Sequence, residues 1–223
     1  MNNRLSSIIF LSVFSFALLN SCQSIPKNEK AGWLSDFLSG LSCQLPCWDG
    51  IVPGSTTIEE AYKIISSSPE NHDVTYNKPT ELSNHSNLYW SKLQGNGKPY
   101  PHGVITTAVG DEIVSEIDII LHNGGKDTWL YLGEVIETYE DPEYVFNYHT
   151  PNGCAFGVVF PDQGMVALIG MVSYGFTINI RERSSIDFLL FLSEEAIQEP
   201  NYGLEETLSL IEPWAGYARF KCK

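Results

Sequence analysis

Two segments of this chain share one spacing of apolar residues. In each, apolar side chains recur at i, i+3, i+4 and i+7, the pattern of one helix face. The first set is Ile58, Ala61, Tyr62 and Ile65, and the second is Leu132, Val135, Ile136 and Tyr139. A proline follows each segment, and the residue before a proline is disfavoured in helical backbone. The pattern predicts two short helices, Ile58–Ile65 and Tyr131–Tyr139.

The start of the first helix carries a capping signature. Pro53-Gly54 is a turn signal, since proline presets φ and glycine accepts a positive φ. Thr56 and Thr57 follow, each with a glutamate three residues later, Glu59 and Glu60. A threonine hydroxyl and a glutamate carboxylate at this spacing satisfy the free N–H groups of a helix start. We therefore expect the helix to begin directly after this threonine pair.

Runs of β-branched and aromatic residues with partial alternation follow each helix and predict strands. The runs after the first helix are Leu88–Leu93, Val104–Val109 and Ile113–Leu121, and polar residues 70–87 before them are expected to form a loop. The runs after the second helix are Val145–His149, Cys154–Phe160 and Met165–Val172. Turn signals at Gly110-Asp111 and at Pro161–Gly164 separate neighbouring runs, so each helix is expected to precede an antiparallel sheet.

The C-terminal region gives weaker patterns. Ile186–Leu192 is an apolar run that fits a buried strand or a helix, and the strand-like Gly175–Ile180 before it favours a strand. The apolar spacing over residues 204–211 predicts a short helix that ends at Pro213. The aromatic residues near the C-terminus are expected to pack back onto the sheet.

Together these patterns predict an α+β fold of two similar units, each a short helix plus a three- to four-stranded antiparallel sheet. Asn123-Gly124-Gly125 breaks the chain between them. The expected organisation is a leader at residues 1–21, a tether at 22–42, a first unit at 43–123 and a second unit at 124–223.

The N-terminus has the pattern of an export signal. Arg4 precedes an apolar run, Ile8–Leu19, that is too short to span a bilayer as a helix and is typical of a signal peptide. Leu19-Asn20-Ser21-Cys22 fits the bacterial lipobox, which predicts a lipid on Cys22 and a membrane anchor. The alternative is an ordinary secretory signal that is cleaved nearby. The lipoprotein interpretation places the chain on the extracytoplasmic face of the cell membrane or outer membrane.

Apolar residues in the tether predict a short amphipathic helix between Leu34 and Ser39. Trp33, Leu34, Phe37 and Leu38 lie at i, i+1, i+4 and i+5. Such a helix docks on a domain or lies at a membrane surface. The segment has few cations, so docking on the domain is favoured.

Both predicted helices resemble motifs of one family. Residues 50–65, GIVPGSTTIEEAYKII, resemble the G-x-T-x-x-E-h-x-x-h-h signature (h, apolar) of small BamE-like (SmpA/OmlA) envelope lipoproteins. Residues 132–145, LGEVIETYEDPEYV, resemble the related helix-then-G-D-P signature, with Glu140 where that family usually has glycine. Tandem copies of such a unit also occur in the β-lactamase-inhibitor protein. The resemblance implies a helix-plus-sheet fold and an envelope lipoprotein; its motifs specify a helix entry and exit and no chemistry.

The cysteines predict two disulfides. Once Cys22 is set aside, an even number remains, and an exported chain is oxidised. Three connectivities are possible; we favour Cys43 with Cys47 and Cys154 with Cys222. A zinc site would need different spacing with a nearby histidine, and it is less expected in an exported protein.

Charge limits the classes of partner. The chain has 13 Lys and Arg against 27 Asp and Glu, a net charge of −14. An acidic domain repels nucleic acid, so no nucleic-acid partner is expected. No phosphate-binding glycine loop or paired histidine motif indicates a cofactor or metal, and none is expected.

Candidate catalytic groups each have a simpler interpretation. Cys154 near His149 resembles a thiol–imidazole pair, but a disulfide at Cys154 is favoured because a reactive thiolate needs a cationic site. Acidic groups at 111/112, at 140/141/143 and at Glu116/Asp118 are able in principle to bind Ca²⁺ or act as acid and base. Glu116 and Asp118 are two apart on a strand and so share one side, interpreted as solvated. No catalytic residue is assigned.

Aromatic residues give the best candidate for a contact surface. They either mark a face that binds protein or carbohydrate, or fill the groove between helices and sheet. The set is Trp48, Tyr89, Trp90, Tyr100, Trp129, Tyr174 and Trp214. Residues 96–103 have the composition of an exposed loop. The predicted contact surface therefore comprises Trp90, Lys98, Tyr100 and His102.

We expect a lipid-anchored extracytoplasmic protein with a non-enzymatic, protein-binding or envelope-scaffolding role and another envelope protein as partner. The alternatives are an extracytoplasmic hydrolase with an unidentified carboxylate/His site and a module that binds a small ligand or sugar. A cleft that holds a histidine and two carboxylates would favour catalysis, and an aromatic sheet face would favour binding.

Overall fold

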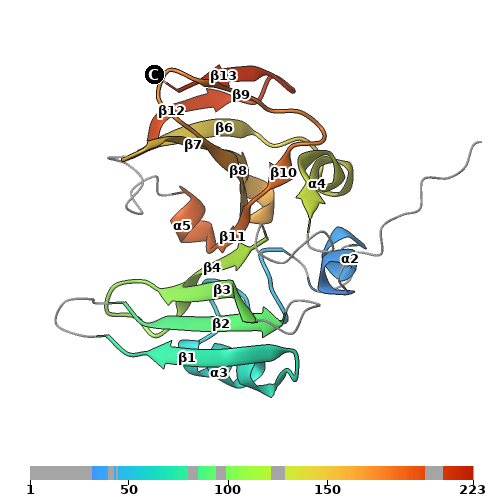
Figure 1. Ribbon diagram of the computed structural model, residues 1–223. Helices are drawn as coiled ribbons and strands as arrows, with labels where there is room; N and C mark the ends of the chain where they lie inside the picture. Colours follow the sequence, from blue (N-terminus) through green and yellow to red (C-terminus); the bar gives the residue numbers. More distant parts are fainter. Residues whose placement is uncertain are drawn as a thin grey trace, which may run out of the picture.

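One large antiparallel sheet dominates the molecule (Figure 1). The computed structural model describes residues 32–39, 43, 45–79, 85–93, 99–121, 129–198 and 208–222. Nine strands form the sheet, in the order β1-β2-β3-β4-β11-β8-β7-β6-β12. The prediction of two separate helix-plus-sheet units is therefore wrong.

The described elements in chain order are α2 (Gly32–Ser39), α3 (Ile58–Ser67), β1 (Asn71–Asn77), β2 (Asn87–Leu93), β3 (Pro99–Thr107), β4 (Val114–Ile120), β5 (Leu130–Tyr131), α4 (Leu132–Tyr139), β6 (Tyr144–Thr150), β7 (Gly153–Phe160), the 3-10 turn η2 (Pro161–Gln163), β8 (Met165–Val172), β9 (Thr177–Asn179), β10 (Ser185–Ile186), β11 (Phe188–Leu192), α5 (Glu194–Gln198), β12 (Leu208–Pro213) and β13 (Arg219–Lys221). Two small two-stranded sheets, β5–β10 and β9–β13, lie outside the main sheet.

The sheet is continuous because β4 pairs with β11. Five residue pairs join these strands, from Phe188↔Ile120 to Leu192↔Glu116. The strands β1 to β4 form one meander, and β11 then pairs with β8 on its other edge. An unpaired strand edge leaves N–H and C=O groups without partners, and this pairing removes two such edges at once. Periodicity and turn residues act over a few positions, so they do not predict a pairing between strands about 70 residues apart.

The two faces of the sheet differ in what covers them. On one face, called here the helical face, a single core of buried residues includes Phe37 from α2, Ile65 from α3 and Val135 from α4. On the opposite face, called here the α5 face, Ala196 of α5 packs with Phe146, Val166 and Leu192. Figure 1 shows α5 on the left of the view and α2 and α4 on the right.

Several local predictions are confirmed. Thr57 caps α3 as a capping box: its hydroxyl accepts a hydrogen bond from the Glu60 N–H at 3.2 Å, and the Glu60 carboxylate accepts one from the Thr57 N–H at 3.0 Å. The second helix is present as α4. The run at residues 186–192 is strand, as favoured, in β10 and β11.

The tether helix docks on the domain, as expected. Leu34 and Phe37 of α2 are buried in the core of the helical face. The ring of Phe37 lies 5.1 Å from that of Tyr139, whose hydroxyl donates a hydrogen bond to the Phe37 carbonyl. The apolar side of this helix is therefore already occupied by the protein.

Three predicted segments are different in the structure. Residues 71–77, expected in a loop, form β1. Half-buried Val74 and Tyr76 alternate with exposed Thr75, but most residues of this strand are polar, so its composition resembles that of a loop. The predicted helix over residues 204–211 is wrong for its described part, because β12 pairs with β6. Its proline ends an edge strand, a position that proline tolerates. The predicted loop at 96–103 is strand from Pro99 onward.

Both favoured disulfides are confirmed. Cys43 is bonded to Cys47, and Cys154 is bonded to Cys222, with sequence separations of 4 and 68 residues. Cys154 and Cys222 are both fully buried. The longer bridge ties the C-terminal end of the chain to the start of β7.

Some predictions fall outside the described residues, namely the leader, Cys22, Lys98 and the boundary at residues 123–125. Within the described parts of the chain, no helix has both the length and the apolar character needed to cross a membrane.

We expect the two disulfides to contribute unequally to stability. Replacing Cys154 and Cys222 by alanine should lower the free energy of unfolding by about 4 kcal/mol, because the bridge closes a long loop in the unfolded chain. The Cys43–Cys47 disulfide closes only a short loop, so the matched Cys43→Ala/Cys47→Ala variant should lower the free energy of unfolding by about 2 kcal/mol. Urea unfolding of both variants measures the difference. Equal losses would contradict the loop-length explanation.

Candidate functional site: a carboxylate pair in the middle of the sheet

One row of directly paired residues crosses all nine strands on the α5 face. The row follows from the register of each neighbouring pair of strands. Its members are Thr75, Tyr89, Val104, Asp118, Leu190, Val166, Val159, Tyr144 and Pro213. Asp118 is the only charged residue in this row. It lies on β4, where it pairs with Leu190 of β11.

Glu116 lies on the same face as Asp118, two residues earlier on β4. The side chains of Glu116 and Asp118 share a hydrogen bond. Their direct cross-strand neighbours are uncharged: Val104 and Leu190 flank Asp118, and Thr106 and Leu192 flank Glu116. The two carboxyl groups therefore have each other as hydrogen-bond partner between uncharged cross-strand neighbours.

This environment favours the protonated form of the pair. Burial, together with the charge and hydrogen bond of Glu116, raises the pKa of Asp118 to about 8. Burial also raises the pKa of Glu116. Two adjacent carboxylates that leave water repel each other, so the pair retains a proton near neutral pH. The prediction of a solvated acidic side is not met, since both side chains are only partly exposed.

No basic residue on the neighbouring strands balances the pair. The strands β3, β4, β11 and β8 contain no lysine or arginine. The Oδ1 atom of Asp118 is buried and has no hydrogen-bond partner within the described residues. Exposed Glu194 and Glu195 at the start of α5 add further acidic groups near this face. Among the described residues, the Oδ1 atom of Asp118 therefore keeps an unused acceptor position in an acidic region of the surface.

The predicted contact residues lie elsewhere. Trp90 and His102 are buried in the core, so neither belongs to an exposed surface. The ring of His102 lies 5.9 Å from that of Trp48 and 6.1 Å from that of Trp90. Burial, with a smaller contribution from Lys92, lowers the pKa of His102 to about 3, so its ring is neutral. Tyr100 contributes its backbone to β3, and Lys98 is outside the described residues.

Trp90 is buried for a reason that is visible in the register. The register of β2 and β3 shifts after Trp90, with His102 as the extra residue on β3, and Trp90 pairs with Gly103, the one residue of β3 without a side chain. A Cβ atom at Gly103 would lie 2.3 Å from the Trp90 ring, so the ring occupies the space that the glycine leaves. The composition of residues 96–103 predicts a loop at Gly103, whereas the structure places this glycine in a strand where the Trp90 ring comes close to the backbone.

The other candidate groups do not converge on a site. Cys154 is in a disulfide, and exposed His149 packs against Tyr174 with ring centroids 5.7 Å apart. Asp111 closes a turn by accepting hydrogen bonds from the N–H groups of Glu112 and Ile113. The group at residues 140, 141 and 143 is exposed. Across the residues that the structure describes, no set of three His, Cys, Asp or Glu side chains has metal-binding geometry.

The aromatic residues of the sequence divide between the core and the surface. Trp48 and Trp90 fill the core, and Trp214 packs against it. Tyr89, Trp129 and Tyr174 are exposed by 40%, 44% and 46%. Of these, Tyr89 belongs to the row that contains Asp118, so an exposed ring and the carboxylate pair share one face.

Comparison with known proteins gave no relative: no family model, no curated protein and no solved structure matches this chain. The resemblance to BamE-like lipoproteins therefore stays a prediction.

The carboxylate pair should make the fold less stable as pH rises. Asp118 has a higher pKa in the folded chain than in the unfolded chain, so between about pH 4 and pH 8 the folded state binds more protons. The free energy of unfolding should then fall with pH across this window, by up to about 1.4 kcal/mol per pH unit for one proton. Asp118→Asn should remove most of this slope, measured by urea unfolding at pH 5, 6, 7 and 8.

Glu112→Gln is the matched control, because Glu112 is exposed in the turn that precedes β4. It should leave the pH dependence of unfolding as in the parent chain. A parent chain whose stability does not change over this pH range would contradict the protonated pair.

Proposed function

We propose that this chain is a lipid-anchored, extracytoplasmic protein of the cell envelope that binds another protein through the α5 face of its sheet. In this proposal, a lysine or arginine side chain of the partner reaches the pair Glu116 and Asp118. The role is binding or scaffolding, and the anchor is a lipid on Cys22.

Export and anchoring are supported by separate features. The leader ends in the lipobox residues 19–22. The two disulfides fit an oxidising compartment outside the cytoplasm. With α2 docked on the core, its apolar side is covered, which leaves the lipid as the proposed means of attachment.

The observation that carries the binding proposal is the buried Asp118 oxygen, which has no donor among the described residues and lies on an interior strand in a row without another charged residue. A buried acceptor without a donor costs free energy, and a charged donor from a partner recovers it. A guanidinium is suited to this task because its fork of N–H groups pairs with carboxylates at two points. The net charge of −14 would also attract a basic partner over longer range.

The rest of the α5 face fits a contact surface. Tyr89 is 40% exposed in the same row, and tyrosine is among the residues that contribute most to protein interfaces. Val104 and Leu190, which lie on either side of Asp118, are half-buried and apolar. Apolar residues around a charged contact exclude water and strengthen it.

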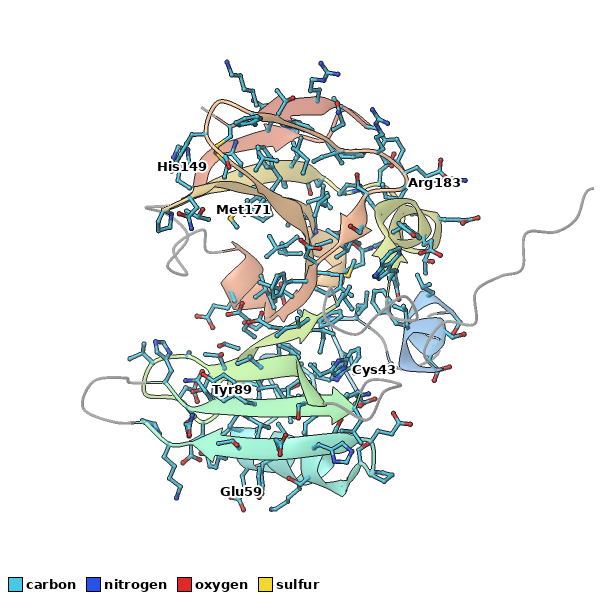
Figure 2. All side chains as sticks on the ribbon, viewed as in Figure 1. Cys43, Glu59, Tyr89, His149, Met171 and Arg183 are labelled. Carbon is cyan, nitrogen blue, oxygen red and sulfur yellow. A yellow bond between two sulfur atoms is a disulfide. The ribbon has the colours of Figure 1, made fainter. Side chains whose placement is uncertain are left out.

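The hydrolase alternative gains no support from the described residues. His102 is buried on the helical face, whereas Glu116 and Asp118 lie on the α5 face. Figure 2 shows His149 in the other half of the molecule from Tyr89. A histidine and two carboxylates thus do not meet in one cleft within this part of the chain.

Photo-crosslinking from two tyrosines tests the proposal in the cell. Tyr89 and Tyr62 are exposed by 40% and 39%, but Tyr62 lies on α3, on the helical side. A benzophenone amino acid in place of Tyr89 should crosslink a defined partner at a segment that contains lysine or arginine, whereas the same residue in place of Tyr62 should not. Identical products from both positions would contradict the assigned face.

Asp118→Asn in the Tyr89 crosslinking chain tests the charge contact. Loss of one charge-assisted hydrogen bond of about 2 kcal/mol should weaken binding of the captured partner about thirtyfold. Glu112→Gln should leave it unchanged. Cys22→Ala should lower the crosslinking yield by removing the proposed anchor. A partner that binds Asp118→Asn as tightly as the parent chain would exclude the pair from the interface.

A further inference from the structure

A cavity lies between the main sheet and the C-terminal strands, away from the carboxylate pair. Its volume is about 290 Å³. One wall is formed by β6 and β7 of the main sheet, and the opposite wall by β13 and the segment before it. Figure 1 shows the β9–β13 sheet beyond β12 and β6, at the end of the molecule opposite to β1.

The cavity is lined mainly by apolar groups. Phe156 and Val145 are buried in the sheet wall, and Phe220 of β13 faces them, with its ring 6.2 Å from that of Phe156. Ala215 and Ala218 lie on the other wall, where short side chains leave the space open. Aromatic and aliphatic walls of this kind are typical of small-molecule sites.

The walls are held in place without a ligand. The Cys154–Cys222 disulfide fixes the end of β13 to β7. Backbone hydrogen bonds run from Ile180 N–H to the Ala218 carbonyl at 2.9 Å and from Trp214 N–H to the Glu143 carbonyl at 2.8 Å. A preformed cavity costs a ligand little ordering free energy, which favours binding.

The charges at the cavity are unlike those of the whole chain. Arg219 and Lys221 line it together with a single carboxylate, Glu212. Within the described residues, ion pairs form at Lys63 and Lys92, and neither Arg219 nor Lys221 lies within salt-bridge distance of a carboxylate. The Arg219 Nε donates to the Asn179 Oδ1 at 2.9 Å. Two cations without a carboxylate partner favour an anionic group at the mouth of an apolar site.

We propose that this cavity binds a small apolar molecule that carries one anionic group, with its apolar part against Phe220, Ala215 and Ala218 and its charge near Arg219 and Lys221. The size is consistent: a cavity of about 150 Å³ holds benzene, and this one is about twice as large. One or two rings, or a short acyl chain, fill that volume. The proposal is independent of the α5 face.

Two fluorescent probes with the same rings test both parts of the proposal. One is 8-anilinonaphthalene-1-sulfonate, which carries an anionic group, and the other is neutral N-phenyl-1-naphthylamine. The full chain with both disulfides formed should bind the sulfonate saturably at one site. The neutral probe should bind at least about tenfold more weakly, the equivalent of one charge-assisted contact. No saturable binding, or equal binding of the two probes, would overturn the proposal.

Variants locate the site. Ala215→Trp and Ala218→Trp place a large ring at the wall and should each reduce sulfonate affinity at least about tenfold, on the scale of a filled pocket. Val109→Trp is the matched control, because Val109 is 62% exposed in the turn between β3 and β4. Arg219→Gln with Lys221→Gln leaves the apolar walls intact and should weaken only the anionic probe. Undiminished binding in both tryptophan variants would place the probe elsewhere and overturn the proposal.

Discussion

The pairing of β4 with β11 is the constraint on which the rest of this structure depends. It joins the first meander to the strands of the second half, and it places β4 in the interior of the sheet. Without it, β4 would be an edge strand with one side open to water. Because β4 is interior, its α5 side is flanked on both sides by uncharged neighbours, and its two acidic side chains lose much of their hydration.

The character of the carboxylate pair follows from that position. The same Glu116-x-Asp118 pattern at a sheet edge would be an ordinary solvated acidic side. Between Val104 and Leu190, Asp118 instead forms a hydrogen bond with Glu116, and burial beside this second carboxyl group raises its pKa to about 8. The Oδ1 atom of Asp118 has no hydrogen-bond donor among the described residues. A polar group in this condition reduces the stability of the isolated chain, and such groups are concentrated at functional sites. The proposed basic partner accounts for both the position and the charge of the pair.

The C-terminal region is organised by a different interaction. The Cys154–Cys222 disulfide and the β9–β13 pairing hold a short ribbon over the end of the helical face. The small residues before β13 do not fill the space beneath the ribbon, and the cavity results. The molecule therefore has two candidate binding regions on opposite faces of the sheet, with different charge and different chemistry.

The sequence by itself determined the local elements. Caps and periodicity act over a few residues, so the sequence predicts these features correctly. They are the capping box at Thr57 and Glu60, the two amphipathic helices, the strand at residues 186–192 and the docked tether helix. The favoured disulfide pairing was also correct. Only the tertiary structure decided which strand edges meet, that Trp90 and His102 are buried, and that Asp118 is central. These depend on contacts between residues far apart in the chain, such as Asp118 with Leu190, and no local spacing encodes them.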